Sequence, residues 1–247
     1  MESKNHPFSI FHFPFSIMNV AIIVAAGSGT RFGSETPKQF LEILGKPLVV
    51  HTLERFDYCP TIARIILVLP AGRIENFSNI VDNYNLKKLV KMVAGGKTRA
   101  ESVLSGLNAI DSQKAEIIAV HDGARPLVSQ AEITNTIEKA KTTGAACLVA
   151  AVTDTIKEVA NGKIVKTIDR TKLRRALTPQ CFSYEILKRD FAENEIGEIA
   201  TDECFLVEKL GCEIAVVEGS AKNIKVTTPE DFVLAEGLLK ELQIENV

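Results

Sequence analysis

Short apolar runs typical of buried β-strands alternate with helical patterns along most of the chain, and no other sequence feature constrains the fold as strongly. The runs end in polar or glycine-containing loops and cover Val20–Ala26, Ile65–Leu69, Leu89–Val93, Ile117–Val120 and Ala145–Val152. Helices are predicted between them, near 48–57, 73–84, 98–110 and 130–142. Strands that alternate with helices build a parallel sheet whose two faces are both covered. We therefore predict an α/β protein with a Rossmann-like, mostly parallel sheet and helices on both faces.

Two of the predicted helices carry start signals. Thr98 precedes Glu101, and Ser129 precedes Glu132, with the three-residue spacing of a capping box. Farther along, the pattern predicts helices near 183–194 and 202–210, strands over 213–217 and 223–227, and a closing helix from Thr228-Pro229-Glu230. No repeat or long linker interrupts this order in the sequence, so residues 18–247 are predicted to form a single domain.

One segment, which we call the arm (residues 153–170), departs from the alternation. Two short alternating runs, 154–159 and 163–168, flank Asn161-Gly162, a residue pair typical of tight hairpin turns. The sequence thus predicts a β-hairpin inserted into an α/β chain. Because an isolated hairpin is marginally stable in water, either a partner subunit or the chain's own domain must support it. The spacing alone favours neither.

The first 17 residues precede the predicted domain. The stretch Phe8–Ala26 has no charged side chain and imitates a membrane segment or a signal peptide. His12 and Pro14 interrupt it, and Met18 stands directly before the first strand. We predict that residues 1–17 are a dispensable extension. Export or membrane anchoring is the alternative, which full activity of a chain started at Met18 would exclude.

Composition and charge exclude several kinds of function. Apolar residues make up 46% of the chain and charged residues 24%, which excludes wholesale disorder. The formal net charge of −2 provides no basic excess for a nucleic-acid backbone. The five cysteines form no C-x-x-C pair and no histidines have metal-ligand spacing. The cysteines therefore indicate reduced thiols of a cytoplasmic protein rather than a disulfide framework or a zinc site.

The loop after the first strand is rich in glycine and contains a cation. It reads Gly27-Ser-Gly-Thr-Arg-Phe-Gly33, which lacks both the glycine spacing of a dinucleotide-binding loop and the lysine of a P-loop. Its backbone N–H groups would still approach an anion, with Arg31 inside the loop and Lys38 seven residues later. The alternative is a plain turn with two solvated cations.

Lys38 and the next glycine pair suggest where a nucleotide would lie. A lysine that follows Pro37 can serve as a fixed positive charge beside a transferring phosphate. Gly95-Gly96 comes directly after the third strand and precedes Arg99 and Ser102, so a base or ribose would have room against the backbone. An ordinary turn and helix start is the alternative reading of this pair.

The fourth strand leads into His121-Asp-Gly-Ala-Arg-Pro126. Asp122 is placed to hold Mg²⁺ together with phosphate oxygens, because magnesium usually takes one or two carboxylates plus substrate phosphates. Arg125 would clamp a second phosphate or a sugar hydroxyl. The alternative is an internal ion pair between Asp122 and Arg125 that fixes the loop. His121 is a candidate acid or base, although a structural histidine is the simpler interpretation.

Lys225 lies between apolar Ile224 and Val226, and strand alternation would turn it to the opposite side, toward solvent or a site. No Ser–His–Asp order, catalytic carboxylate pair or activated cysteine is evident in the sequence. Cations, glycines and one well-placed carboxylate are what phosphoryl or nucleotidyl transfer requires, since that chemistry depends on positioning and charge neutralisation.

Eight motifs follow one another in a fixed order. They are Ala25-Ala-Gly-x-Gly-Thr-Arg31, Pro37-Lys-Gln39, Gly95-Gly96 with Ser102, His121-Asp-Gly-Ala-Arg-Pro126, Asp169-Arg170, Leu177-Thr-Pro-Gln180, Thr201-Asp-Glu203 and Asn223-Ile-Lys-Val-Thr227. Each is weak alone, but together they closely resemble the 2-C-methyl-D-erythritol 4-phosphate cytidylyltransferase family. The resemblance runs from about Met18 to the last helix.

This resemblance implies a nucleotidyltransferase fold and a reaction of isoprenoid biosynthesis by the non-mevalonate route. CTP and 2-C-methyl-D-erythritol 4-phosphate would give 4-diphosphocytidyl-2-C-methyl-D-erythritol and pyrophosphate, by in-line attack of the sugar phosphate on the α-phosphorus of CTP. The implied roles are catalysis by Arg31, Lys38, Arg170 and Lys225, nucleotide binding by Ala25, Ala26, Gly27, Gly96 and Ser102, sugar-phosphate contacts by Arg125 and Thr201, and Mg²⁺ binding by Asp122. The resemblance also implies a homodimer in which the arm embraces the second subunit and Arg170 acts across the interface.

Two alternatives to this activity come from the same motifs. Sister enzymes that couple CTP to D-ribitol 5-phosphate share several of them, but Ala25-Ala-Gly27 and Asp169-Arg170 favour the methylerythritol enzyme. A catalytically silent nucleotide-binding subunit would lack Lys38, Asp122 or Lys225, and none is missing. Lys97 departs from the family pattern, which commonly has an acid there, so the ribose or base contact at that position is an open question.

Overall fold

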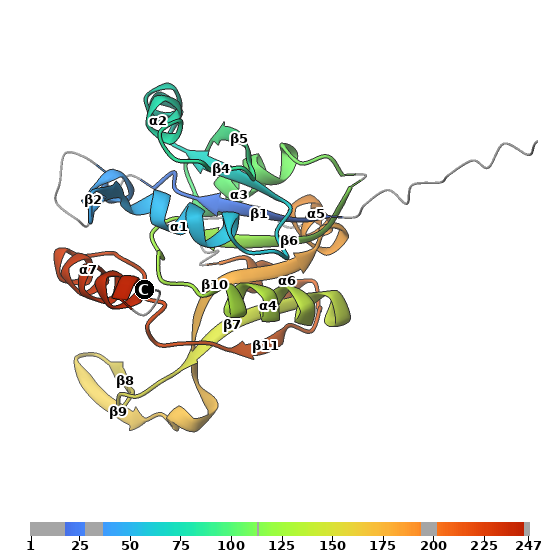
Figure 1. Cartoon of the computed structure of the whole chain (residues 1–247). Coiled ribbons are helices and arrows are strands. Elements are labelled where there is room, and N and C mark those ends of the chain that lie inside the picture. Colours follow the sequence, from blue (N-terminus) through green and yellow to red (C-terminus); the bar gives the residue numbers. More distant parts are fainter. Residues whose placement is uncertain (1–17, 28–36, 113, 194–201, 245–247) are drawn as a thin grey trace, which may run out of the picture.

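The computed structural model describes residues 18–27, 37–112, 114–193 and 202–244, and a seven-stranded sheet lies at its centre (Figure 1). In sheet order the strands are β11 (Ala215–Glu218), β7 (Ala145–Ala151), β10 (Arg174–Ser183), β6 (Ala115–Asp122), β1 (Met18–Val24), β4 (Arg64–Leu69) and β5 (Leu89–Ala94). Only β10 runs antiparallel to its neighbours. The predicted mostly parallel sheet is confirmed.

Helices cover both faces of the sheet because the side chains of each strand alternate between two apolar layers. In β1, Ala21 and Ile23 pack into one layer while Val20 and Ile22 pack into the other. The first layer is closed by α1 (Leu48–Asp57), α2 (Ile74–Val81) and α4 (Gln130–Thr143). The second is closed by α3 (Arg99–Asn108), α5 (Tyr184–Glu193) and α6 (Glu203–Lys209).

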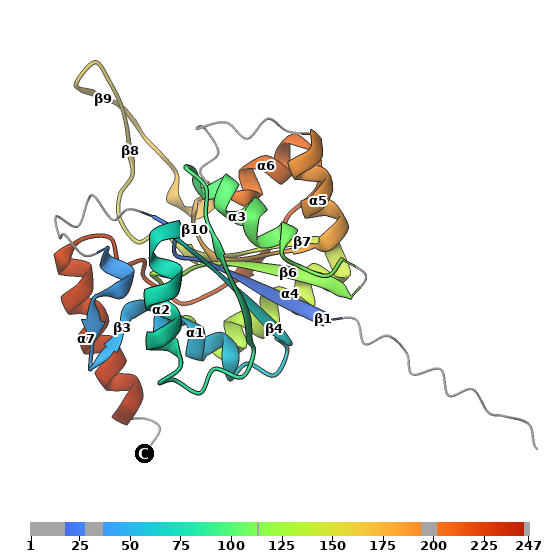
Figure 2. The same ribbon diagram turned by 90° about the horizontal axis from the view of Figure 1, so that it is seen from above.

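A third, smaller apolar cluster holds the last helix to the domain. Helix α7 (Pro229–Ile244) packs Ala235 and Leu239 against Ile43 and Leu48, beside the short strands β2 (Glu42–Ile43) and β3 (Lys46–Pro47). Figure 2 shows α7 alongside β3 at one end of the molecule. The 3₁₀ turns η2 (Lys38–Phe40) and η3 (Ala71–Arg73) precede α1 and α2 along the chain.

The predicted helices and their start signals are confirmed. Thr98 and Ser129 form complete capping boxes, in which each side chain accepts from the third helical residue and that glutamate accepts in return. The predicted strand over 223–227 is wrong, because these residues join no ladder. The segment is instead tied to the loop after β6, where the N–H of Val226 donates to the carbonyl of Ala124 at 2.9 Å.

Strand β10 is absent from the sequence-based prediction although it occupies the middle of the sheet. Two adjacent arginines begin it, and Thr178-Pro179 falls inside it. Proline cannot donate to a ladder and charged side chains are rare in central strands, so both features argue against a buried strand. The pairing with β7 shifts register between Ala176 and Gln180, and this irregularity accommodates the proline.

The arm is a hairpin of two antiparallel strands, β8 (Lys157–Ala160) and β9 (Lys163–Thr167), as predicted. Asn161 and Gly162 form its turn with φ angles of 52° and 73°, the left-handed conformations that such a turn requires. Every residue of both strands is exposed. The arm therefore extends away from its own domain rather than folding onto it (Figures 1 and 2).

Candidate active site

A cleft of about 500 Å³ opens at the carboxyl ends of β1 and β6. From β1 the chain adds β4 and β5 on one side and then crosses to β6 on the other, so the strand order reverses at this point. Such reversals are where ligands bind in open α/β sheets. The lining residues are Val24, Ala25, Ala26, Gly27, Lys38, Gln39, Gly96, Lys97, Thr98, Arg99, Ser102, Asp122, Ala124, Lys225 and Thr227.

The start of the glycine loop forms part of this lining and is held by Gln39. The side-chain amide of Gln39 donates to the carbonyls of Ala25 and Gly27 at 2.8 and 2.9 Å, and the residue is almost fully buried. These bonds join η2 to the loop after β1. Arg31 lies outside the described residues. Gln39 has a supporting role that the sequence did not suggest, because nothing in its spacing ties it to a carbonyl 14 residues earlier.

The second glycine pair closes tightly on the same lining. A Cβ at Gly95 would stand 2.3 Å from the Cβ of Ala26 and 2.7 Å from the Ser102 hydroxyl, so only glycine fits. The N–H of Gly96 donates to the Ser102 hydroxyl at 3.2 Å, and that hydroxyl donates to the carbonyl of Thr98. Ser102 therefore holds this loop in place. Nucleotide contacts of Gly96 and Ser102 stay predictions.

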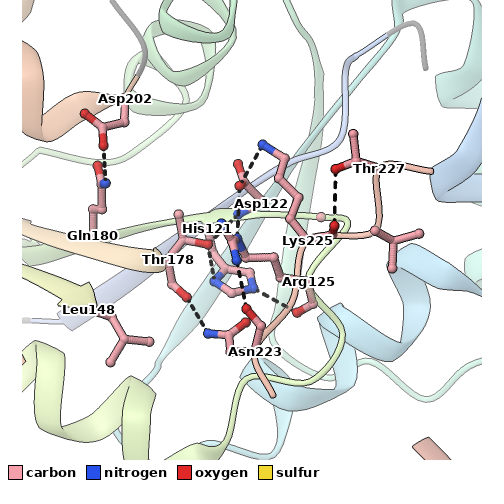
Figure 3. Close-up of polar contacts among 12 residues, drawn as sticks. His121, Asp122, Arg125, Leu148, Thr178, Gln180, Asp202, Asn223, Lys225 and Thr227 are labelled. Carbon is pink, nitrogen blue, oxygen red and sulfur yellow. Dashed lines mark hydrogen bonds and ion pairs between the residues drawn. The ribbon is translucent and has the colours of Figure 1, made fainter. Parts of the chain in front are cut away.

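Asp122 is the centre of the charged network in the cleft. One carboxylate oxygen, Oδ1, accepts from Arg99 Nε at 3.2 Å. The other, Oδ2, accepts from Arg125 Nε at 3.3 Å and from Lys225 Nζ at 2.9 Å (Figure 3). Burial acts to raise the pKa of Asp122, but the three cations together hold it well below its usual value. Asp122 is thus an ionised carboxylate in a strongly positive setting.

Two lysines from distant parts of the sequence line the cleft near this carboxylate. Lys225 keeps over a third of its side chain exposed while it contacts Asp122. The ammonium of Lys38 donates to the carbonyl of Val226, the residue after Lys225. Of the two directions that the sequence left open for Lys225, solvent or a site, the side chain takes the one into the cleft. A catalytic role of Lys225 stays a prediction. The extended segment through 225–226 is what brings both cations to the cleft.

Arg125 is buried and adopts the internal ion pair that the sequence left as an alternative. Besides Asp122, its guanidinium donates to the carbonyl of Asn223 at 2.8 Å. Arg125 is not among the residues that line the cleft, within the described part of the chain. Burial lowers the pKa of Arg125, and Asp122 opposes that shift. A sugar-phosphate contact of Arg125 stays a prediction.

His121 is a structural histidine. Its ring bonds the carbonyl of Arg125 at 3.1 Å and the hydroxyl of Thr178 at 3.0 Å, and it packs against Phe56. The residue is fully buried, and burial lowers its pKa to about 3. The imidazole is therefore neutral at physiological pH and holds the loop after β6 to β10 (Figure 3). The structure does not support it as an acid or base.

One predicted site residue, Arg170, does not join this cluster within a single chain. Arg170 begins the 3₁₀ turn η4 (Arg170–Lys172) at the end of the arm, where its guanidinium donates to the carbonyl of Thr153. Among the residues described, it does not line the cleft. Thr201 lies outside the described residues. Its neighbour Asp202 accepts from the Gln180 amide at 2.8 Å.

The ion pair between Arg99, which lines the cleft, and buried Glu203 was not predicted from the sequence. The Arg99 guanidinium, which also contacts Asp122, donates to both carboxylate oxygens of Glu203. Glu203 is fully buried, and burial raises its pKa against the opposing effect of Arg99. Arg99 comes three residues after Gly95-Gly96, and Glu203 ends the motif Thr201-Asp-Glu203, but neither received a role from the sequence. Nothing in the sequence indicates that residues 104 positions apart pair.

The donor set suits a magnesium ion that is shared with substrate phosphates. Asp122 is the only carboxylate among the described residues that line the cleft. No group of three or more potential metal ligands exists in the described ranges, so a site made wholly of protein ligands is not found there. One ionised carboxylate at the cleft fits a Mg²⁺ ion that takes its other oxygen ligands from water and phosphate.

Two further features bear on the setting of the protein. No helix in the described ranges is long and apolar enough to cross a membrane. The five cysteines are free thiols, and four of them are buried, as the sequence predicted.

Comparison with known proteins agrees with this geometry. A family model described as 2-C-methyl-D-erythritol 4-phosphate cytidylyltransferase matches residues 19–241. Proteins of that name are similar: the one from Desulforamulus reducens is 43% identical over 224 residues, covering 90% of this chain and 95% of the relative. The one from Bacillus licheniformis is 40% identical over 225 residues, covering 90% and 96%. The crystal structure of 4-diphosphocytidyl-2C-methyl-D-erythritol synthase from Anaerococcus prevotii aligns with a TM-score of 0.79 at 27% identity, covering 91% of this chain and 96% of that one.

Proposed function

This chain belongs to the 2-C-methyl-D-erythritol 4-phosphate cytidylyltransferase family, and we propose how its own residues carry out the transfer. The protein is a nucleotidyltransferase of isoprenoid biosynthesis that couples CTP and 2-C-methyl-D-erythritol 4-phosphate. The assignment of roles rests on one observation. The Asp122 carboxylate lies at the cleft and contacts Lys225 through one oxygen and Arg99 through the other.

The reaction joins two highly charged molecules, so charge neutralisation dominates its energetics. An oxygen of the acceptor phosphate attacks the α-phosphorus of CTP, the bond to the bridging oxygen breaks, and pyrophosphate leaves. Negative charge gathers on the oxygens around the α-phosphorus as this happens. Lys38 and Arg31 would stabilise that charge from the glycine-loop side of the cleft. Lys225 would position the attacking phosphate, and the backbone of Ala25, Ala26 and Gly27 would receive the nucleotide with Gly96 and Ser102.

Mg²⁺ would be held by Asp122 and by oxygens of the triphosphate. When bound, the ion supplies positive charge that neutralises the phosphates. Lys225 is the cation whose exposed side chain can leave the Asp122 carboxylate when phosphates enter, since Arg99 and Arg125 are fixed by further bonds. Asp122 is already ionised before any ligand arrives, because its neighbours hold its pKa low.

The arm would place Arg170 in the site of a second subunit. Its exposed apolar side chains, Val159, Ile164 and Val165, are 56–66% accessible and fit a role in contact with another copy of the chain. Arg170 would then contact the sugar phosphate of the partner's site, together with Arg125 and Thr201 of that site. We place the homodimer in the cytoplasm, where free thiols such as the five cysteines persist.

A mixed-dimer experiment tests this cross-subunit role. Subunits that carry Arg170→Ala and subunits that carry Lys38→Ala are coexpressed with different tags, and mixed dimers are purified through both tags. If Arg170 serves the neighbour, each mixed dimer has one intact site, and about half of wild-type turnover returns. If Arg170 serves its own chain, both sites stay defective and activity remains at the level of the unmixed variants, which are the matched controls.

The activity itself is tested by pyrophosphate release from purified protein with CTP. Parallel reactions contain 2-C-methyl-D-erythritol 4-phosphate or D-ribitol 5-phosphate, each with Mg²⁺ or with excess EDTA. We expect release only with the methylerythritol acceptor, and a fall to background in EDTA. Release with the ribitol acceptor alone would contradict the substrate assignment. A folded protein that binds CTP and is silent with both acceptors would contradict catalysis, and full activity in EDTA would contradict the metal role of Asp122.

A further inference from the structure

Arg99 joins two segments that bound the cleft, yet the roles assigned above give it no part. It is the first residue of α3 and directly follows the loop that contains Gly96. Its Nε donates to Asp122 Oδ1 at 3.2 Å, and its Nη1 donates to both oxygens of Glu203. Glu203 is the first residue of α6, two positions after Thr201. One guanidinium thus connects the nucleotide loop, the central carboxylate and the helix that follows the acceptor-binding segment.

The elements that carry these groups have fixed starts. Thr98 caps α3 through a complete capping box with Glu101. Asp202 caps α6 by accepting from the N–H of Phe205 at 2.9 Å. Arg99 and Glu203 are therefore held at defined positions on two helices, and Asp122 is the last residue of β6. A planar guanidinium with several fixed donors spans the two carboxylates as no lysine would.

The charge distribution makes Arg99 necessary for this arrangement. Within the described residues, Arg99 is the one cation paired with buried Glu203. It is also the one cation on Asp122 Oδ1, because Arg125 and Lys225 both contact Oδ2. Without Arg99, the Asp122 carboxylate would lose its ion pair at Oδ1 and keep only the contacts at Oδ2. Glu203 would be left as a buried charge without a partner, which is unfavourable.

We propose that Arg99 is a positioning residue for nucleotidyl transfer. Arg99 sets the orientation of Asp122 and connects the nucleotide loop to the start of α6. The groups that would bind the two substrates are thereby held at fixed positions relative to one another. The proposal rests on the proposed function for the identity of the two substrates. It assigns Arg99 no contact with either of them.

Two variants of Arg99 and a matched control test this role through steady-state kinetics. For Arg99→Gln we expect kcat to fall about 100-fold and the KM for CTP to rise about 10-fold, because Asp122 and the loop that contains Gly96 lose their fixed orientation. Arg99→Lys keeps the charge without the planar fork, and we expect it to recover less than about a tenth of the lost kcat. Arg64→Gln makes the same chemical change at the start of β4, at the end of the parallel strands opposite to the cleft, and should stay within about twofold of wild type.

The variant Glu203→Gln distinguishes an effect on acceptor binding from an effect on nucleotide binding. This variant leaves Arg99 paired with Asp122, so we expect the KM for the acceptor phosphate to rise while the KM for CTP stays within about twofold. The double variant of Arg99→Gln and Glu203→Gln should be no slower than Arg99→Gln alone, since both act through one contact. Additive losses in the double variant would contradict the shared role.

Two outcomes would overturn the proposal. One is an Arg99→Gln protein within about threefold of wild type in kcat and both KM values. The other is full recovery by Arg99→Lys, which would reduce Arg99 to a counter-charge for Glu203. CTP binding measured by calorimetry without acceptor gives a readout that does not depend on turnover, and Arg99→Gln should weaken it about 10-fold. A wild-type protein that binds CTP but releases no pyrophosphate would contradict the proposed function alone, and the calorimetric comparison would still decide the role of Arg99.

Discussion

Lys38→Ala is expected to lower kcat by about 10²- to 10³-fold while the protein stays folded, which corresponds to a loss of about 3–4 kcal/mol of transition-state stabilisation. The lysine lines the cleft from η2 and reaches the segment after Lys225, so its charge lies where phosphates must crowd together. Because that charge matters most when negative charge builds up, we expect kcat to change more than the KM for CTP. Pyrophosphate release at saturating substrates measures the effect.

Lys46→Ala is the matched control for this variant. Lys46 forms an ion pair with Glu54 at 2.6 Å and does not line the cleft, within the described residues. Its removal should cost at most about 1 kcal/mol of stability and leave turnover within about threefold of wild type. Equal turnover of Lys38→Ala and wild type would remove Lys38 from the mechanism. Equal losses in the two lysine variants would point to a general effect of lost charge.

Asp122→Asn combines a large loss of stability with a large loss of activity. The buried carboxylate balances Arg99, Arg125 and Lys225, and asparagine would leave these cations without their shared partner. We expect the free energy of unfolding to fall by about 3–5 kcal/mol, as measured by chemical denaturation. Turnover should fall at least about 10²-fold, because the same carboxylate contacts all three cations and, under the proposed function, would hold Mg²⁺.

The pH dependence of stability gives a second measurement of the same charge. Burial opposes ionisation of Asp122, but its three cations hold the folded-state pKa well below the usual value. Its contribution is therefore present above the ordinary aspartate pKa of about 4 and is lost as the pH falls toward the lower folded-state value. The wild-type protein should lose stability over this acid range more steeply than Asp122→Asn does. Asp111→Asn, at an exposed ion pair with Lys114, should leave stability and this slope nearly unchanged. Parallel pH profiles for wild type and Asp122→Asn would contradict the charge balance.

Much of the fold could be predicted because local pattern and tertiary structure agree along the first 150 residues. The apolar runs that became β1, β4, β6 and β7 are largely buried, and parallel strands covered on both faces show up as continuous apolar stretches. Strand β10 could not be predicted, because its arginines and proline are tolerated only through a register shift and the pairing with both neighbours. The strand predicted over 223–227 was wrong for the opposite reason. The residues alternate as in a strand, but their backbone bonds to a loop instead of a neighbouring strand.

The candidate site was only partly accessible to sequence reasoning. Asp122, Lys38 and Lys225 each follow or sit within a recognisable motif, and the fold brings them to one cleft. The partners that fix them are encoded by tertiary contact alone. Gln39 reaches back to the glycine loop, and Arg99 spans from one helix start to another 104 residues away. Contacts at such separations leave no periodicity or spacing to detect.

The place of β10 in the sheet has a consequence for the order in which a growing chain can become structured. Strands β1, β4, β5 and β6 pair with one another and can assemble once residue 122 has left the ribosome. Strand β7 follows in sequence, but its sheet neighbours β10 and β11 are both made later, so it has no ladder to join during that interval. Nearly thirty residues of apolar strand and exposed arm must therefore wait for the segment after residue 174 to be translated. The second half of the sheet closes when β10 enters between β6 and β7, and β11 is added last at the outer edge. A ribosome stalled before residue 174 would present an unpaired apolar strand to the cell.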